Sequence, residues 1–286
     1  MAGGIDAFYL AADQQRGGQR LCLYHPGRAG VPRGAVVYVH PFAEEMNKSR
    51  RMAAQQARAL AEAGFAVLQI DLLGCGDSSG DFGDATWDDW VADVEHASRW
   101  LRQRCDAPLW LWGLRAGALV AAAAAQRMDE PCHFLFWQPT PVGAVVLQQF
   151  LRLKAAAGLA DGGSKAVLNE VRGSLAHGRS VDIAGYALPA ALARGLEAAT
   201  LAPPRRPGRV VWLEVSNRED ATLGPASVNA VERWRLAGCE VHAALVPGPA
   251  FWQTVEIEDA PALLTATTAQ LASAAMPAVV AVDHQP

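Results

Sequence analysis

The chain has 286 residues, of which 51% are hydrophobic and 19% are charged, and its formal net charge is −4. Such a chain can bury a substantial core, and its composition is that of an ordinary globular protein. With no basic run or stripe, the sequence argues against a nucleic-acid partner.

Cysteine spacing and hydropathy exclude further classes. The five cysteines are scattered without CxxC spacing, which argues against a disulfide framework and a zinc site. No metal or organic cofactor is implied. The first ten residues lack the features of a signal peptide, and the alanine-rich run 116–125 is too short to span a bilayer. We therefore expect a cytoplasmic protein without a membrane span.

The first third alternates strand and helix patterns. Residues 34–40 form an apolar run typical of a buried strand, and residues 49–63 are predicted to form a helix that ends at Gly64. A second strand is predicted at 65–71, and a glycine-rich loop follows at 74–80.

The same alternation continues to the end of the chain. A capping box of Thr86 and Asp89 begins a helix with a buried apolar stripe. Further strands are predicted at 109–113, 133–137, 210–215 and 240–246, and further helices at 116–128, 226–237 and 259–275. Strands that alternate with helices predict an α/β fold with a mainly parallel sheet covered on both faces.

The alternation stops between residues 139 and 208. Helical patterns at 142–157 and 165–176 are joined there by turn-rich segments with little strand character. We interpret 140–207 as a helical lid inserted into a single domain that covers 1–276, and we expect a loose tail at 277–286.

A strand–turn–helix motif is centred on Arg115. The sequence Gly113-Leu-Arg-Ala-Gly117 lies between a predicted strand and a predicted helix. In α/β-hydrolases a G-x-S-x-G turn at this point projects the nucleophilic serine over the sheet. Gly113 and Ala116 are candidates for the oxyanion hole or ligand-binding site, but the central residue here is arginine.

Two other motifs support the same fold. His40-Pro41-Phe42 resembles the loop that supplies an oxyanion-hole amide, which assigns that amide to Phe42. Asp71-Leu-Leu-Gly-Cys-Gly-Asp-Ser78 resembles the family's D-x-x-G-x-G-x-S loop, so Ser78 is a loop position rather than a displaced nucleophile. Together the motifs predict an α/β-hydrolase fold.

A narrower resemblance covers most of the chain. Residues 40–51, 72–80, 112–117 and 248–254 are similar to the second of two families of hydrolase-like proteins encoded with exosortase A. The resemblance implies a bacterial system that sorts proteins with a PEP-CTERM tail and makes exopolysaccharide. It also implies a hydrolase. It does not imply a particular substrate.

The serine triad is incomplete in this sequence. Asp220 or Glu219 could serve as the acid after the seventh strand of the fold. The catalytic histidine would follow the last strand, but residues 247–253 contain none. Phe251 and Trp252 could fill the space that it leaves, and Trp252 is a candidate ligand-binding residue. Two of the three triad roles are therefore vacant.

Arginine cannot act as nucleophile or base, because its guanidinium stays protonated. Arg115 could bind a phosphate, sulfate or carboxylate together with backbone amides, or it could form an internal ion pair with Glu44 or Glu45. Alternatively, His40 could act as a base with Glu44 or Glu45 as its partner.

Three functional hypotheses follow. The protein is a degenerate or non-classical hydrolase of an exosortase and exopolysaccharide system. Alternatively, it is a pseudoenzyme that binds an anionic saccharide or lipid-linked intermediate through Arg115, or an esterase or thioesterase that uses His40 with Glu44 or Glu45.

Overall fold

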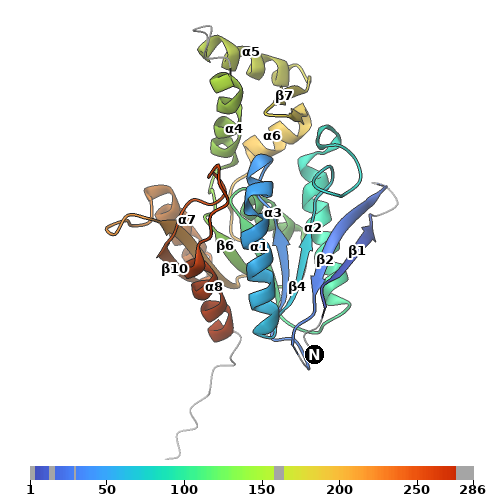
Figure 1. Cartoon of the computed structure of the whole chain (residues 1–286), viewed down its shortest axis with the longest axis vertical. Helices are drawn as coiled ribbons and strands as arrows, with labels where there is room; N and C mark the ends of the chain where they lie inside the picture. Colours follow the sequence, from blue (N-terminus) through green and yellow to red (C-terminus); the bar gives the residue numbers. More distant parts are fainter. Residues whose placement is uncertain (1–3, 13–16, 29, 158–163, 275–286) are drawn as a thin grey trace, which may run out of the picture.

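The structure, a computed structural model, describes residues 4–12, 17–28, 30–157 and 164–274 (Figure 1). Its main sheet has eight strands in the order β1-β2-β4-β3-β5-β6-β9-β10. These strands are β1 (Asp6–Ala11), β2 (Gln19–His25), β3 (Ala35–Val39), β4 (Ala66–Ile70), β5 (Leu109–Leu114), β6 (His133–Trp137), β9 (Arg209–Ser216) and β10 (Glu240–Pro247).

Six neighbouring strands of this sheet, from β4 to β10, are parallel, which confirms the predicted α/β architecture. Only β1 and β2 run antiparallel, at one edge. These two strands were not predicted, although residues 7–11 and 21–24 are short apolar runs, because they form an antiparallel pair outside the alternation of strands and helices. The parallel strands end at one common edge, where the loops that follow β3, β5 and β10 come together.

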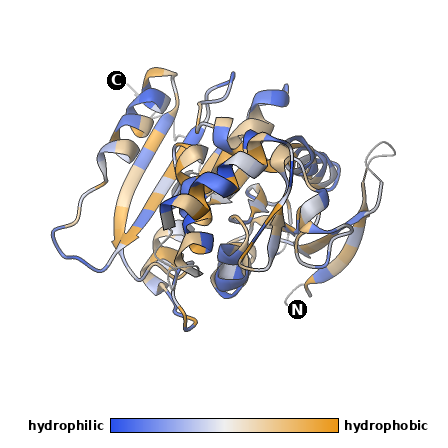
Figure 2. Ribbon diagram, turned by 90° about the horizontal axis from the view of Figure 1, so that it is seen from above, coloured by the Kyte–Doolittle hydropathy of each residue, from blue (hydrophilic) through white to orange (hydrophobic). Residues whose placement is uncertain are grey.

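Helices cover both faces of the sheet. α1 (Glu44–Glu62) and α8 (Pro261–Ala274) pack on one face, and α2 (Trp87–Arg102), α3 (Gly117–Arg127) and α7 (Pro225–Leu236) pack on the other. Each face has its own apolar cluster, with Trp112 and Trp137 on the α1 side and Trp212 and Trp234 on the other. The strands are largely apolar, whereas hydrophilic residues gather on the outer helix surfaces and loops (Figure 2).

Residues between β6 and β9 stand above the sheet (Figure 1). They form α4 (Gly143–Ala157), α5 (Ser164–Ala176), a hairpin of β7 (Val181–Ile183) and β8 (Tyr186–Leu188), and α6 (Ala190–Ala198). α4 and α5 agree with the helical patterns in the sequence, whereas the hairpin and α6 were not predicted. We call this segment the insertion. The predicted tail at 277–286 lies outside the described residues.

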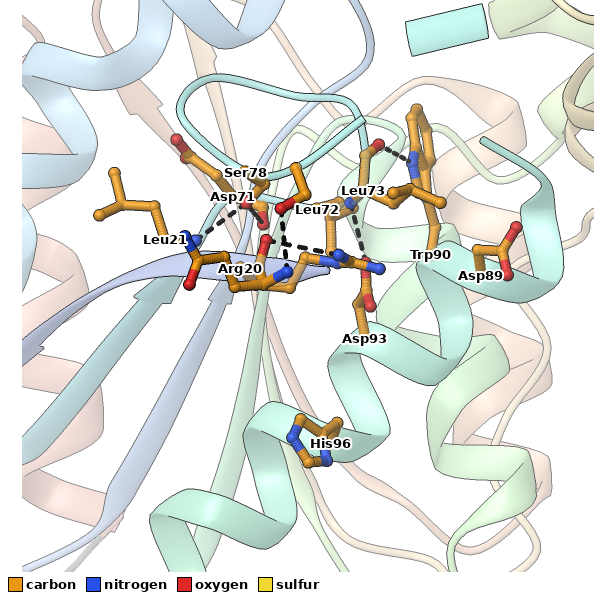
Figure 3. Close-up of polar contacts among 12 residues, drawn as sticks. Arg20, Leu21, Asp71, Leu72, Leu73, Ser78, Asp89, Trp90, Asp93 and His96 are labelled. Atoms are coloured by element: carbon orange, nitrogen blue, oxygen red, sulfur yellow. Dashed lines mark hydrogen bonds and ion pairs between the residues drawn. The ribbon is translucent and has the colours of Figure 1, made fainter. Parts of the chain in front are cut away.

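A buried polar network fastens the antiparallel edge to the rest of the molecule (Figure 3). The Nε of Arg20 on β2 donates to Oδ2 of Asp93 on α2 at 2.8 Å, and the Leu73 amide donates to the same oxygen at 2.8 Å. The Ser78 hydroxyl donates to the Asp71 carbonyl and accepts from the Leu21 amide. Ser78 therefore holds its loop against β2.

Candidate functional site

The turn between β5 and α3 has the geometry of a nucleophile elbow. Arg115 has φ 54°, in the left-handed region that non-glycine residues rarely adopt. A Cβ on Gly113 would overlap the backbone of Ala118, and a Cβ on Gly117 would overlap the carbonyl oxygens of Val39 and His40. The two glycines therefore permit the close approach of strand and helix that this turn requires.

The Arg115 side chain is buried and held by three partners. Its Nε and Nη2 donate to Oε1 of Glu45 at 3.2 and 3.1 Å. Nη1 donates to the Thr140 hydroxyl and Nη2 to Oε1 of Gln149, each at 3.1 Å. Thr140 precedes α4 and Gln149 lies on it, so Arg115 joins the elbow to both α1 and the insertion. These two partners were not predicted, because nothing in their local sequence indicates a contact with the elbow.

The guanidinium pairs with Glu45 rather than with Glu44, although both lie in the first turn of α1. Successive helical residues point about 100° apart, so only one of the two can face Arg115. Burial raises the pKa of Glu45, and the neighbouring Arg115 opposes that shift without cancelling it. Burial also raises the pKa of Glu44, which Lys48 opposes. Both carboxyl groups therefore favour protonation more than they would in water.

His40 is buried, and both of its ring nitrogens have partners. Nδ1 lies 2.8 Å from the Pro41 carbonyl, and Nε2 accepts from the Leu72 amide at 3.2 Å. This pattern requires the neutral ring with its proton on Nδ1. Burial lowers the pKa of His40, which favours the same neutral form. The structure thus gives His40 a role in holding its loop, and it shows no contact between His40 and Glu44 or Glu45.

Phe42 and Ala116, the residues expected to form an oxyanion hole, lie at the ends of neighbouring strands. Phe42 follows β3 and Ala116 follows Arg115, and both are buried at the carboxyl edge of the sheet. Phe42 packs against Trp90 and Phe150, so its position is fixed by aromatic contacts from α2 and the insertion. The structure therefore places both residues at the carboxyl edge of the sheet, next to the elbow.

The other two triad positions differ from those of a serine hydrolase. Asp220 follows β9 with its side chain 84% exposed, and its carboxylate lies 3.7 Å from the Arg218 guanidinium. After β10, Trp252 is buried, and its ring centroid lies 5.4 Å from Cζ of Arg115. The structure therefore brings Trp252, but not Asp220, into contact with the elbow arginine.

A pocket of about 300 Å³ opens beside this arrangement. Its wall combines the start of α1, one face of α4 and the loop after β10. The lining residues are Phe42, Glu44, Glu45, Lys48, Val146, Gln149, Phe150, Leu153, Trp252 and Gln253. We call this space the elbow pocket. Arg115 is not among the lining residues, but it contacts three of them, Glu45, Gln149 and Trp252.

None of the helices in the described part of the chain is long and apolar enough to cross a membrane. A model of the family described as serine aminopeptidase, S33 matches residues 30–140, a segment that includes the elbow. Human protein ABHD12B is 32% identical over 133 residues, which cover 46% of this chain and 33% of that protein.

A thermostable monoacylglycerol lipase from Bacillus sp. (strain H-257) is 31% identical over 128 residues, covering 45% of this chain and 46% of the lipase. The matches thus span less than half of the length of either curated relative. Among solved structures, Est1E from Butyrivibrio proteoclasticus with bound ferulic acid has a TM-score of 0.65 at 17% identity, covering 93% of this chain and 97% of Est1E.

A thermostable carboxyl esterase from Bacillus coagulans in complex with glycerol also has a TM-score of 0.65, at 14% identity, covering 96% of this chain and all of that one. At such low identity, these likenesses concern the fold alone. They agree with the mostly parallel sheet flanked by helices. The protein therefore has the α/β-hydrolase fold, as its sequence motifs predicted.

Proposed function

We propose that this protein binds a ligand in the elbow pocket and does not hydrolyse esters by a serine mechanism. The observation that carries this proposal is the state of Arg115, which occupies the nucleophile position and is bound by Glu45, Thr140 and Gln149. A permanently protonated guanidinium can neither attack a carbonyl carbon nor accept a proton. Without a nucleophile, the remaining scaffold can position a ligand but cannot form an acyl-enzyme.

The resemblance to exosortase-associated proteins supports a place for this pseudoenzyme in a PEP-CTERM and exopolysaccharide system. It favours a saccharide or a lipid-linked saccharide as the ligand, handled by a protein whose insertion acts as a lid. An anionic group could reach Arg115 only by replacing Glu45, because the carboxylate already accepts from two guanidinium nitrogens. An anionic ligand is therefore the less favoured form of the proposal.

A second candidate function has one observation in its favour. The raised pKa of Glu44 and Glu45 is a property of carboxyl groups that act as general acids. The names of the lipase and esterase relatives make an ester or thioester the bond to test. His40 is a poor base for such a reaction, because both of its ring nitrogens are engaged.

Turnover of nitrophenyl esters and thioesters with short and medium acyl chains separates the two candidates. The binding protein should give no rate above that of buffer, with wild type and Arg115→Ala alike. A rate that Glu44→Gln or Glu45→Gln abolishes, while the thermal unfolding curve is unchanged, would instead establish the second candidate and overturn the first.

A further inference from the structure

Three buried polar atoms without a hydrogen-bond partner among the described residues belong to side chains that line the elbow pocket. They are Oε2 of Glu44, Oε2 of Glu45 and Nε1 of Trp252. Trp252 is only 4% exposed, so it has little access to bulk water. Buried polar groups in folded proteins are nearly always paired, and a group of exceptions in one place indicates that a partner is missing.

The chemistry of these three atoms restricts that partner. A carboxylate oxygen accepts hydrogen bonds, whereas the indole N–H can only donate one. An ammonium group could satisfy Glu44 and Glu45 but offers nothing to Trp252. An anion could accept from Trp252 but would be repelled by the carboxylates. A hydroxyl group both donates and accepts, so a ligand with several hydroxyl groups can satisfy all three atoms.

The charge of the pocket points to the same class. Arg115 forms an ion pair with Glu45 and neutralises its charge. Lys48 lies one turn after Glu44 on α1, and its positive charge acts on the Glu44 carboxylate. Two acidic and two basic groups leave no net charge for an ionic ligand to balance. Binding of an uncharged ligand therefore avoids the cost of removing a charged ligand from water without a counter-ion to compensate.

The rest of the wall suits a ring that carries hydroxyl groups. Gln149 and Gln253 supply amide groups that both donate and accept, and Phe42, Phe150 and Leu153 supply apolar surface for carbon-bound hydrogens. The volume of about 300 Å³ is at the lower end of the range for small-molecule sites. It fits a ligand of about one sugar unit.

We propose that the elbow pocket binds an uncharged polyhydroxylated ligand the size of a sugar unit, recognised by Glu44, Glu45 and Trp252. This inference rests on the proposed function, because a catalytic protein would present the same pocket to an ester. It adds the ligand class, and it favours a neutral saccharide over the anionic ligand that an unpaired Arg115 would bind.

Sugars with one skeleton and three charge states test the ligand class. The full chain is titrated with glucose, galactose and mannose, each beside its uronic acid and its 2-amino sugar, and binding is followed by calorimetry and by ligand-observed NMR. At least one neutral sugar should bind about tenfold more tightly than its charged counterparts. Tighter binding of a uronic acid or amino sugar, or no binding of any neutral sugar, overturns the proposal.

Two tryptophan variants locate the site. Trp252→Phe keeps an aromatic ring and removes the unpartnered N–H, and it should weaken binding by up to roughly tenfold, as expected for one hydrogen bond. Trp112→Phe is the matched control, because Trp112 is also buried with an unpartnered Nε1 but does not line the pocket. An equal loss of affinity in both variants, or no loss of affinity in Trp252→Phe, contradicts the assignment of the binding site to the elbow pocket.

A third variant covers the case in which Trp252→Phe fails to fold. Glu44→Gln, at a half-buried position on the first turn of α1, keeps the shape and removes the charge, and it should weaken binding severalfold. Ester turnover measured on the same samples keeps the two proposals distinguishable. Turnover would refute the proposed function, whereas no turnover with binding of a uronic acid would refute the ligand class alone.

Discussion

Two buried arginine–carboxylate pairs in this molecule differ in their surroundings. Arg20 and Asp93 join β2 to α2, with side chains only 1% and 5% exposed and an Nε–Oδ2 distance of 2.8 Å (Figure 3). Arg115 and Glu45 join the elbow to α1, with side chains 10% and 13% exposed and an Nη2–Oε1 distance of 3.1 Å. The Asp93 carboxylate also accepts from a backbone amide of the glycine-rich loop, whereas the Glu45 carboxylate borders a pocket.

The difference shows how the same chemistry can serve stability or function. Asp93 uses Oδ2 twice, for Arg20 and for Leu73, so it ties three segments together. Glu45 uses only Oε1 for Arg115, and its Oε2 has no partner among the described residues. Both pairs link separate elements and contribute to the free energy of unfolding, but only the Arg115–Glu45 pair includes a pocket-lining side chain whose second oxygen has no partner among the described residues.

The largest expected effect is on Asp93. Asp93→Ala should lower the free energy of unfolding by about 3–5 kcal/mol, because it leaves the Arg20 guanidinium buried without its counter-ion. Urea denaturation measures the change. Asp88→Ala, which removes a partner of Arg127 at the surface, is the control and should cost at most about 1 kcal/mol. Equal losses in the two variants would contradict the account of the Arg20–Asp93 pair.

Loss of Glu45 should have a smaller effect. Glu45→Ala should lower the free energy of unfolding by about 1–3 kcal/mol, since Arg115 keeps its bonds to Thr140 and Gln149. The same urea experiment measures it, with Glu44→Ala as the neighbouring control that leaves Arg115 paired. A loss as large as that of Asp93→Ala would show that the two pairs do not differ in the way proposed.

The pH dependence of stability should report the raised pKa of Glu45. Its folded-state pKa lies above the ordinary value of 4.5 because of burial, so the folded protein holds the Glu45 proton more strongly than the unfolded chain does. This group's contribution to the free energy of unfolding is therefore fully present below pH 4.5 and falls as the pH rises through its folded pKa. As the pH rises from 4 to 7, the urea midpoint of the wild type should therefore fall relative to that of Glu45→Gln.

Glu45→Gln removes only this titration, so the difference between the two stability curves isolates it from the titrations of Glu44 and Asp93. A wild type that gains stability relative to Glu45→Gln as the pH rises would mean that Arg115 dominates the carboxylate and lowers its pKa. That result would contradict the assignment of burial as the larger effect.

The smallest expected effect is catalytic. Arg115→Ser restores the residue type of a nucleophile elbow but should give no esterase activity, because Trp252 rather than histidine lies beside it and both His40 nitrogens are engaged. Hydrolysis of a short-chain nitrophenyl ester measures this. Turnover by Arg115→Ser comparable to that of a serine hydrolase would mean that a base lies within reach of the elbow.

Local sequence patterns predicted much of the fold. Apolar runs and glycines gave the parallel strands and the elbow, because buried strands and close backbone approaches have strong local requirements. The edge strands β1 and β2 were missed, since they form an antiparallel pair outside the alternation of strands and helices, although each contains a short apolar run. For the site, the sequence offered Glu44 and Glu45 as equal partners of Arg115, and only the direction of each side chain on α1 distinguishes them. Thr140 and Gln149 depend on how the insertion packs, which no local pattern contains.

We propose that the elbow of this α/β-hydrolase fold has no activated nucleophile and serves binding instead. The most direct test of this proposal is the intact mass of the full-length wild-type protein after treatment with a fluorophosphonate probe, which reacts with activated serine hydroxyls. We expect an unchanged mass. A stoichiometric adduct on any hydroxyl-bearing residue of the chain, lost when that residue is replaced by alanine, would contradict the proposal.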